Sequence, residues 1–136
     1  MEYTLTLHND VQEVPLLARF IDTISEENAM DMEMSKNINL AVEEAVVNVM
    51  NYAYPKGTVG EVKIDASVTD GLLTLLISDS GTPFDPTVKK DPDINLPAEK
   101  RAIGGLGILL VRQIMDTVTY RYTDGKNILT LVKKLN

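Results

Sequence analysis

The sequence contains no cysteine, and histidine occurs only once, at His8. The absence of cysteine excludes disulfide bonds and thiolate metal sites, and a single histidine excludes a metal centre built from several imidazoles. The chain has 136 residues, of which 44% are apolar. This length and composition favour one compact domain, residues 1–136, with a proper hydrophobic core.

Long apolar runs and an excess of basic residues are also missing. No run approaches the roughly 20 residues that a membrane-spanning helix needs, and residues 1–10, MEYTLTLHND, lack the basic and apolar regions of a signal peptide. We therefore expect a cytoplasmic protein without a membrane partner. The net charge of −7 disfavours direct nucleic-acid binding, because phosphates would be repelled over most of the surface, and it suits partners with basic surfaces.

Hydrophobic periodicity predicts strands and helices that are segregated along the chain, in the order strand, helix, helix, strand, strand, lid, helix, strand, strand. The helical pattern covers residues 14–30, 32–52 and 106–118, and the strand pattern covers residues 2–10, 62–68, 72–79, 119–122 and 127–135. The pairs Asp70-Gly71 and Asp124-Gly125 are typical of two-residue hairpin turns. This order predicts a two-layer α/β sandwich, in which about three helices cover one face of a mixed, mostly antiparallel sheet.

The helix expected at 32–52 carries an unusual polar stripe. Glu44, Asn48 and Asn51 follow each other at spacings of four and three residues, so they share one helix face. An ordinary solvated stripe is one interpretation. Asparagine is an indifferent helix former, which favours a functional stripe instead. The helix alone leaves both interpretations open.

Two further motifs carry chemistry. The segment DSGTPFDP begins with Asp79 at the end of an apolar strand, where a carboxylate caps a turn or accepts a hydrogen bond from an exocyclic amine, and Gly81 would let a flat base approach the backbone. The segment IGGLGI, residues 103–108, leads into a helix and leaves main-chain N–H groups free for a phosphate. Between the motifs lies a charged, proline-containing stretch that we interpret as a lid, about residues 86–104.

In this order, the motifs resemble the ATP-binding fold shared by gyrase, Hsp90, histidine kinases and MutL. EEAVVN resembles its N box, DSGTPFD its first glycine box and GGLGI its second. The closest resemblance is to the anti-sigma factor serine kinases of bacteria, of the sporulation and general-stress type. It extends over essentially the whole chain and includes NYAYP after the N box, the PFDP extension and the terminal LTLVKKL.

The resemblance implies that ATP and Mg²⁺ are the cofactors, and it assigns roles to the motifs. Asn48 is the expected Mg²⁺ ligand, Glu44 the base that receives the proton of the attacking serine, and Asp79 the residue that reads the adenine amine. A neutral amide oxygen suits Mg²⁺ when ATP supplies the charge. The expected nucleotide-binding residues are Asn48, Asn51, Tyr52, Asp79, Gly81, Gly105, Leu106, Gly107 and Ile108.

The sequence departs from the family pattern before its last strand. Sporulation-type members carry Gly-Thr there, and that threonine can contact the nucleotide. This chain has DGKNILT, so either Asn127 substitutes for the threonine or the contact is absent. The lid offers cations for the γ-phosphate, but no pattern selects among Lys89, Lys90, Lys100 and Arg101.

The function implied by the resemblance is that of an anti-sigma regulatory factor. It would bind a sigma factor and, with Mg-ATP, phosphorylate a serine of an anti-anti-sigma protein of the STAS type. The family also implies a homodimer. Two alternatives remain: a nucleotide-gated binding module without phosphotransfer, and a detached histidine-kinase catalytic domain.

Overall fold

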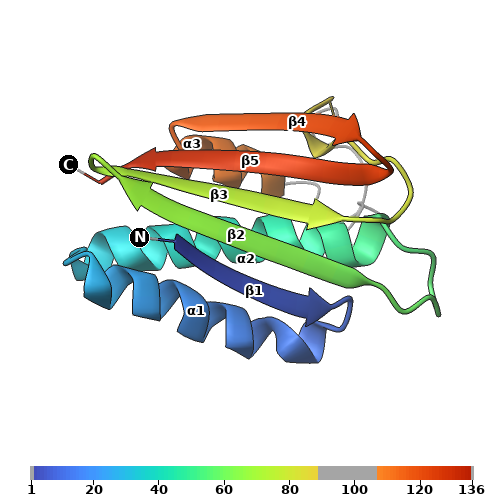
Figure 1. Cartoon of the computed structure of the whole chain (residues 1–136), viewed down its shortest axis with the longest axis horizontal. Coiled ribbons are helices and arrows are strands. Elements are labelled where there is room, and N and C mark those ends of the chain that lie inside the picture. The colour runs from blue at the N-terminus through green and yellow to red at the C-terminus, as the bar shows by residue number, and fades with distance from the viewer. Residues whose placement is uncertain (1, 89–106, 136) are drawn as a thin grey trace, which may run out of the picture.

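The structure is a computed structural model that describes residues 2–88 and 107–135. Within these ranges, the strands form one sheet in the order β1-β2-β3-β5-β4, and the α-helices cover one of its faces (Figure 1). This arrangement confirms the predicted two-layer α/β class. The elements are β1 (Glu2–His8), η1 (Val11–Glu13), α1 (Val14–Glu27), α2 (Met32–Tyr52), β2 (Glu61–Thr69), β3 (Leu72–Asp79), η2 (Pro86–Val88), α3 (Gly107–Ile114), β4 (Thr117–Thr123) and β5 (Lys126–Lys134).

The sheet is antiparallel at every pairing between the described strands, so the expectation of a mixed sheet is wrong. The reason is that two helices, α1 and α2, connect β1 to β2. A single helix between two strands returns the chain to a parallel start. Here α1 and α2 together reverse the chain twice, so β2 starts at the end of the sheet where β1 finishes (Figure 1).

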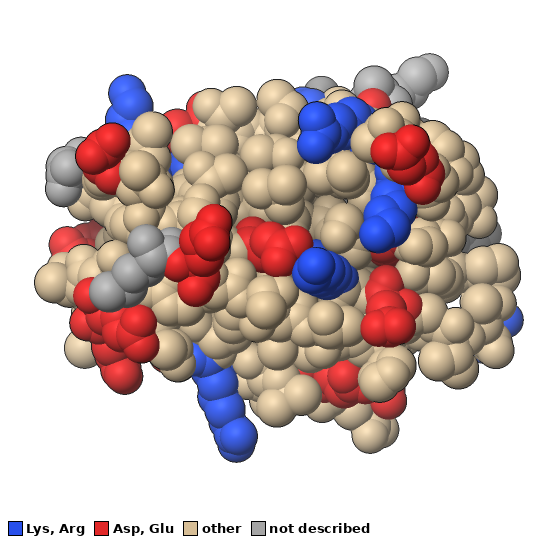
Figure 2. Space-filling model, in the orientation of Figure 1, with Lys and Arg blue, Asp and Glu red and all other residues tan. Residues whose placement is uncertain are grey.

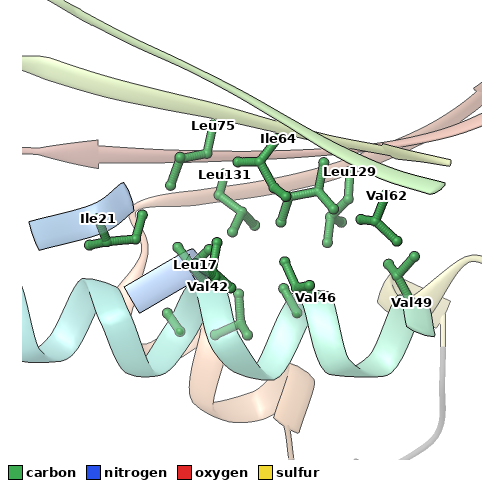
Figure 3. Packing of buried hydrophobic residues seen from close by; sticks show 14 of the residues in the cluster. Leu17, Ile21, Val42, Val46, Val49, Val62, Ile64, Leu75, Leu129 and Leu131 are labelled. Carbon is green, nitrogen blue, oxygen red and sulfur yellow. The ribbon is translucent and has the colours of Figure 1, made fainter. Parts of the chain in front are cut away.

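The core lies between α2 and the middle of the sheet. Val42, Val46 and Val49 of α2 point toward sheet residues, and α1 contributes Leu17 and Ile21 (Figure 3). Each fully buried side chain of this kind contributes about 1.5–3 kcal/mol of transfer free energy. This apolar contact holds α2 against the sheet and thereby fixes the position of the polar stripe on the helix. The sheet residues opposite are Val62, Ile64, Leu75, Leu129 and Leu131.

The ends of α2 agree with the predicted range of 32–52. Asp31 caps the start, because its carboxylate accepts a hydrogen bond from the Met34 N–H at 2.7 Å. The two Asp-Gly turns also form as predicted. The aspartates have φ values of 52° and 53°, and Gly71 and Gly125 both have φ of 76°. Two successive residues with positive φ are typical of the turn that matches the twist of a hairpin.

The third helix is shorter than predicted, since α3 ends at Ile114 rather than at residue 118. Thr117 and Val118 instead pair with Val132 and Leu131 in the sheet. Both are β-branched residues, which favour a strand, and cross-strand pairing overrides the helical periodicity. The predicted lid, about residues 86–104, lies outside the described residues apart from η2.

The surface in the view of Figure 1 carries acidic and basic side chains interspersed, without one continuous basic area (Figure 2). Such a distribution gives no electrostatic footprint for a phosphate backbone on this face. Among the described helices, none is long and apolar enough to cross a membrane.

Candidate functional site

Three segments meet at one end of the sheet: the last turns of α2, the end of β3 with the turn that follows it, and the start of β5 (Figure 1). The turn after β3 is attached to the helix, because the Thr82 N–H donates to the Ala53 carbonyl at 2.6 Å. Asp79 and Gly81, predicted from the sequence, are therefore held beside the end of the helix that carries Asn48.

Asp79 is the chemically distinctive residue of this end. It is only 4% exposed, and its Oδ1 accepts hydrogen bonds from the Gly81 N–H at 2.8 Å and from Asn127 Nδ2 at 2.9 Å. Its Oδ2 is buried and has no partner among the described residues. A buried acceptor without a donor costs about 1–3 kcal/mol, so this oxygen is suited to a donor that a ligand brings.

Burial raises the pKa of Asp79 above its ordinary value, and the hydrogen bonds from Asn127 and Gly81 oppose that rise. The strand explains why a carboxylate lies in such a place. Leu73, Leu75 and Ile77 alternate with outward residues and face the helices, and Asp79 continues the same alternation. The period of β3 thus directs an acid into the layer between sheet and helices.

Gly81 is required by packing against α2. A Cβ at this position would lie 2.2 Å from the Ala53 carbonyl oxygen, and a backbone oxygen cannot move aside as a flexible side chain can. The sequence interpretation had linked this glycine to the approach of a base. The structure adds a reason within the chain, which is the close contact between the turn and the end of the helix.

Asn48 is 5% exposed, and its side-chain amide makes no hydrogen bond to another residue within 2–88 or 107–135. Glu44 lies one helical turn earlier, a rise of about 6 Å, and is half-buried. The described residues contain no group of three or more acidic, histidine or cysteine side chains that could hold a metal. A metal at Asn48 would therefore take most of its ligands from water and phosphate, as Mg²⁺ commonly does.

Tyr52 and Phe84 form an aromatic pair at the edge of the site. Their ring centroids are 5.4 Å apart and their planes differ by 23°, a stacked arrangement. The pair connects the end of α2 to the turn after β3. Phe84 was not among the predicted site residues, although the PFDP extension was a visible signal.

Asn51 is exposed, whereas Asp79 is buried. Together with Tyr52, Asn51 lines a groove of ≈ 890 Å³, which also contacts the β1–η1 turn and the segment 54–59. Neither Asn48 nor Asp79 lines this groove. Asn51 and Tyr52 therefore line a groove that does not include the buried carboxylate, and Tyr52 also stacks on Phe84 of the turn after β3.

The second glycine motif lies partly outside the described residues, which is the case for Gly105 and Leu106. Gly107 is the first residue of α3, and Ile108 is 4% exposed and belongs to the hydrophobic core. Any contact of Ile108 with a phosphate would therefore involve its main-chain N–H at the start of the helix. The lid cations Lys89, Lys90, Lys100 and Arg101 are also outside the described residues.

Asn127 is 4% exposed and pairs directly across the sheet with Asp79. Its amide nitrogen donates to Asp79 Oδ1 and to the Thr82 carbonyl in the turn. The sequence showed this residue only as a departure from the family pattern. The hairpin turns fix only the registers of β2 with β3 and of β4 with β5, so the pairing of Asp79 with Asn127 across β3 and β5 depends on the tertiary fold.

Comparison with known proteins agrees with this geometry. The chain belongs to the family of histidine kinase-like ATPase domains, which matches residues 7–133. The resemblance inferred from the three motifs is thereby confirmed at the level of the family. A family of ATPase domains also supports ATP as the nucleotide.

Within this family, the chain is similar to bacterial serine kinases. It is 28% identical over 137 residues to the serine-protein kinase RsbW of Listeria monocytogenes, covering 98% of this chain and 87% of that protein. It is 30% identical over 94 residues to the serine/threonine-protein kinase BtrW of Bordetella bronchiseptica, covering 69% of this chain and 66% of that protein. The prediction of an enzyme of the anti-sigma serine kinase type is supported by these names.

The fold is shared with solved structures. The RsbU and RsbW domains of a Mycobacterium tuberculosis protein superpose with a TM-score of 0.71 at 15% identity, over 99% of this chain and 32% of that chain. The histidine kinase AdeS of Acinetobacter baumannii gives a TM-score of 0.55 at 21% identity, over 75% of this chain and 47% of that chain. At these identities the likeness establishes the fold alone.

Proposed function

We propose that the protein is an anti-sigma regulatory factor that binds a sigma factor and uses Mg-ATP to phosphorylate a serine of a STAS-type antagonist. The names of the relatives support the kinase class. The observation that carries the proposal is the buried Oδ2 of Asp79, which has no donor among the described residues. A protein that needed Asp79 only as a turn residue would gain nothing from this orphaned oxygen.

Adenine supplies the donor that Asp79 lacks. An ionised carboxylate only accepts hydrogen bonds, and the exocyclic amine of adenine donates one. Guanine has a carbonyl at the same position, so two acceptors would face each other. The arrangement therefore favours ATP over GTP, and Asp79 is the residue that distinguishes them.

Asn48 and Glu44 fit the phosphate end of the nucleotide. Asn48 is 5% exposed, and its amide oxygen is of the type that Mg²⁺ accepts as a ligand. Bound Mg²⁺ would neutralise phosphate charge during transfer. Glu44 is half-buried, about one helical turn from this ligand, and accepts the proton of the serine hydroxyl as it attacks.

The proposed partners are proteins rather than nucleic acids. The net charge of −7 suits basic surfaces, and the interspersed charges seen in Figure 2 offer no basic area for phosphates. The relatives lead us to propose a sigma factor, a STAS-type antagonist and a second copy of the chain as partners.

Phosphotransfer is tested by incubating the purified protein with labelled Mg-ATP and a cognate serine-bearing antagonist. Glu44→Gln should bind ATP but lose transfer by about 10²- to 10⁴-fold, the usual contribution of a general base. Glu43→Gln is the matched control, because Glu43 is exposed and points to another side of the helix. It should transfer normally.

If the wild type binds ATP and antagonist but transfers no phosphate, the protein is a nucleotide-gated binding module. Label that appears on a histidine of a partner instead of a serine would identify a detached histidine-kinase domain. Either result would overturn the proposed reaction while leaving nucleotide binding intact.

Nucleotide specificity is tested by thermal stabilisation with ATP and GTP. At a hundred times its Kd, ATP should stabilise the protein by about 2.7 kcal/mol, and GTP should have little effect. Asp79→Ala should lose the difference between the two nucleotides. Asp65→Ala, on the opposite face of the sheet, should retain it. Equal stabilisation of the wild type by both nucleotides would contradict the role of Asp79.

A further inference from the structure

Asn127 makes four hydrogen bonds from a buried position at the start of β5. Its Nδ2 donates to Asp79 Oδ1 at 2.9 Å and to the Thr82 carbonyl at 2.9 Å. Its Oδ1 accepts from the Phe84 N–H at 2.9 Å and from the Tyr120 hydroxyl. This amide thus connects the end of β3, the turn that follows it and strand β4.

The orientation of the amide follows from its partners. The Phe84 N–H can only donate, and the Thr82 carbonyl can only accept, so the oxygen must face Phe84 and the nitrogen must face Thr82. The same nitrogen therefore faces Asp79. An amide usually leaves its oxygen and nitrogen ambiguous, but here two backbone groups decide between them.

All hydrogen-bonding capacity of the Asn127 side chain is used within the chain. The amide has two donors and two acceptor positions, and the four bonds occupy all of them. Asn127 therefore does not replace the family threonine as a direct nucleotide contact. Of the two possibilities raised by the sequence, the direct contact is missing, and the residue acts on Asp79 instead.

We infer that Asn127 is a positioning residue for base recognition: its amide holds Oδ1 of Asp79 and thereby directs the free Oδ2 toward the adenine amine. The inference rests on the proposed function, in which Asp79 reads adenine. Gly81 holds the same oxygen through its backbone N–H at 2.8 Å, so two donors together fix the plane of the carboxylate. Without the Asn127 donor, the carboxylate could rotate about its side-chain bond.

The same bond favours the ionised form of the carboxylate. Asn127 and Gly81 lower the pKa of Asp79 against the rise caused by burial. Removal of the Asn127 donor should therefore raise this pKa further. As pH is lowered, the variant should then lose adenine recognition at a higher pH than the wild type does. The Tyr120 hydroxyl faces Asn127, and burial raises the pKa of Tyr120, so this donor stays protonated in the working range. The charges of Asp85 and Asp79 also raise the pKa of Tyr120. Burial and the charge of Asp79 raise the pKa of Tyr54, which packs against the same turn.

The test measures Kd for ATP and for N6,N6-dimethyl-ATP, which lacks the amine donor. The wild type should prefer ATP on the order of 10- to 100-fold, as expected for a hydrogen bond to a charged group. Asn127→Leu, which has a similar shape and no donor, should reduce this preference to below about threefold. Asn39→Leu is the matched control, because Asn39 donates to Asp22 at 3.1 Å outside the site.

A second measurement does not involve the nucleotide. Carboxyl NMR of the empty protein should show a higher pKa for Asp79 in Asn127→Leu than in the wild type and in Asn39→Leu. A merely structural role for Asn127 would weaken both nucleotides equally and would leave the titration of Asp79 unchanged.

Asn127→Asp tests the role of Asn127 if the leucine variant does not fold, because it replaces only the NH₂ group of the side chain by an oxygen. Its new carboxyl repels Asp79 when ionised, but when protonated it donates to Asp79 as the amide did. The preference of this variant for ATP should therefore increase as pH falls, whereas that of the wild type decreases.

The outcomes separate the inference from the proposed function. Equal binding of ATP and its dimethyl analogue by the wild type would overturn the role of Asp79 itself. The role of Asn127 alone would be overturned by another set of results. In that set, the wild type and Asn127→Leu prefer ATP over the dimethyl analogue equally, and the preference of Asn127→Asp changes with pH as that of the wild type does.

Discussion

Two buried polar clusters of this fold differ in whether each side-chain oxygen has a hydrogen-bond partner among the described residues. In the cluster between α1 and α2, the Ser25 hydroxyl is 5% exposed, donates to the Ile21 carbonyl at 2.9 Å and accepts from the Ser35 hydroxyl at 2.8 Å. In the cluster at the end of β3, Asp79 is 4% exposed and keeps one oxygen without a partner among the described residues.

We interpret the difference as separating a cluster that serves the fold from one that serves the proposed nucleotide site. A buried polar group stabilises only when its hydrogen bonds are made. The serine cluster satisfies this condition and connects two helices. The aspartate cluster does not, although Asn127 and Gly81 supply it with donors. Its incomplete bonding is consistent with a site whose last donor comes from outside the chain.

The largest expected effect comes from Gly81→Ala, which disturbs the aspartate cluster and leaves the serine cluster intact. The new methyl group would lie 2.2 Å from the Ala53 carbonyl oxygen, so the turn must move away from α2. We expect a loss of about 3 kcal/mol of unfolding free energy, at the upper end for overpacking, and loss of stabilisation by ATP. Denaturant unfolding with and without ATP measures both.

Ala53→Gly provides the control for this variant. Because the closest contact is with a backbone oxygen, removal of the Ala53 methyl group should not rescue Gly81→Ala. A double variant with wild-type stability would show that the contact is made by side chains.

Asp79→Asn sharpens the comparison by removing the charge while it keeps the acceptor for Gly81 and Asn127. The nitrogen of the new amide should take the place of Oδ2 and face the adenine amine donor to donor. We expect ATP binding to weaken by about 2 kcal/mol, or about 30-fold. The empty protein should become more stable at neutral pH, because an ionised group is no longer buried. Calorimetric titration measures the weaker binding of ATP, and thermal unfolding measures the stability of the empty protein. An empty variant that is less stable than the wild type would contradict the expected gain in stability.

Ser25→Ala tests the satisfied cluster. It leaves the Ser35 hydroxyl without its acceptor and removes a bond to the helix backbone, at a cost of about 1 kcal/mol. ATP should stabilise this variant as much as the wild type, since the cluster lies away from Asp79. Thr23→Ala is the control, because its hydroxyl bonds to the Arg19 carbonyl on an exposed face. Loss of ATP binding in Ser25→Ala would remove the distinction between the clusters.

The smallest expected effect is the pH dependence of the empty protein. The pKa of Asp79 is higher in the folded than in the unfolded state, so the folded state binds more protons between the two values. The contribution of Asp79 to unfolding free energy therefore increases as pH falls through its folded pKa, and it is least favourable above that value. The difference in stability between the wild type and Asp79→Asn should shrink as pH falls. A difference that stays constant with pH would contradict the raised pKa.

The sequence predicted α2 to the residue, and the reason is local. The apolar period and the proline at position 55 predict a helix that ends near Tyr52, and in the structure the Asp31 carboxylate caps its start. The sequence also placed Asp79 at the end of a buried strand and Gly81 in the turn after it, as they lie in the structure. Prediction was weaker where a helix meets a strand. At the end of α3, pairing of Thr117 and Val118 with β5 outweighs their helical period.

The sequence by itself determined the order of the elements, the two Asp-Gly turns and the polar residues at the ends of α2 and β3, since each depends on neighbours along the chain. Only the tertiary structure decided that the sheet is antiparallel throughout, that Gly81 serves the contact with α2, and that Asn127 holds one oxygen of Asp79. These features depend on groups far apart in the chain, such as residues 79 and 127, and no local pattern records how packing brings such groups together.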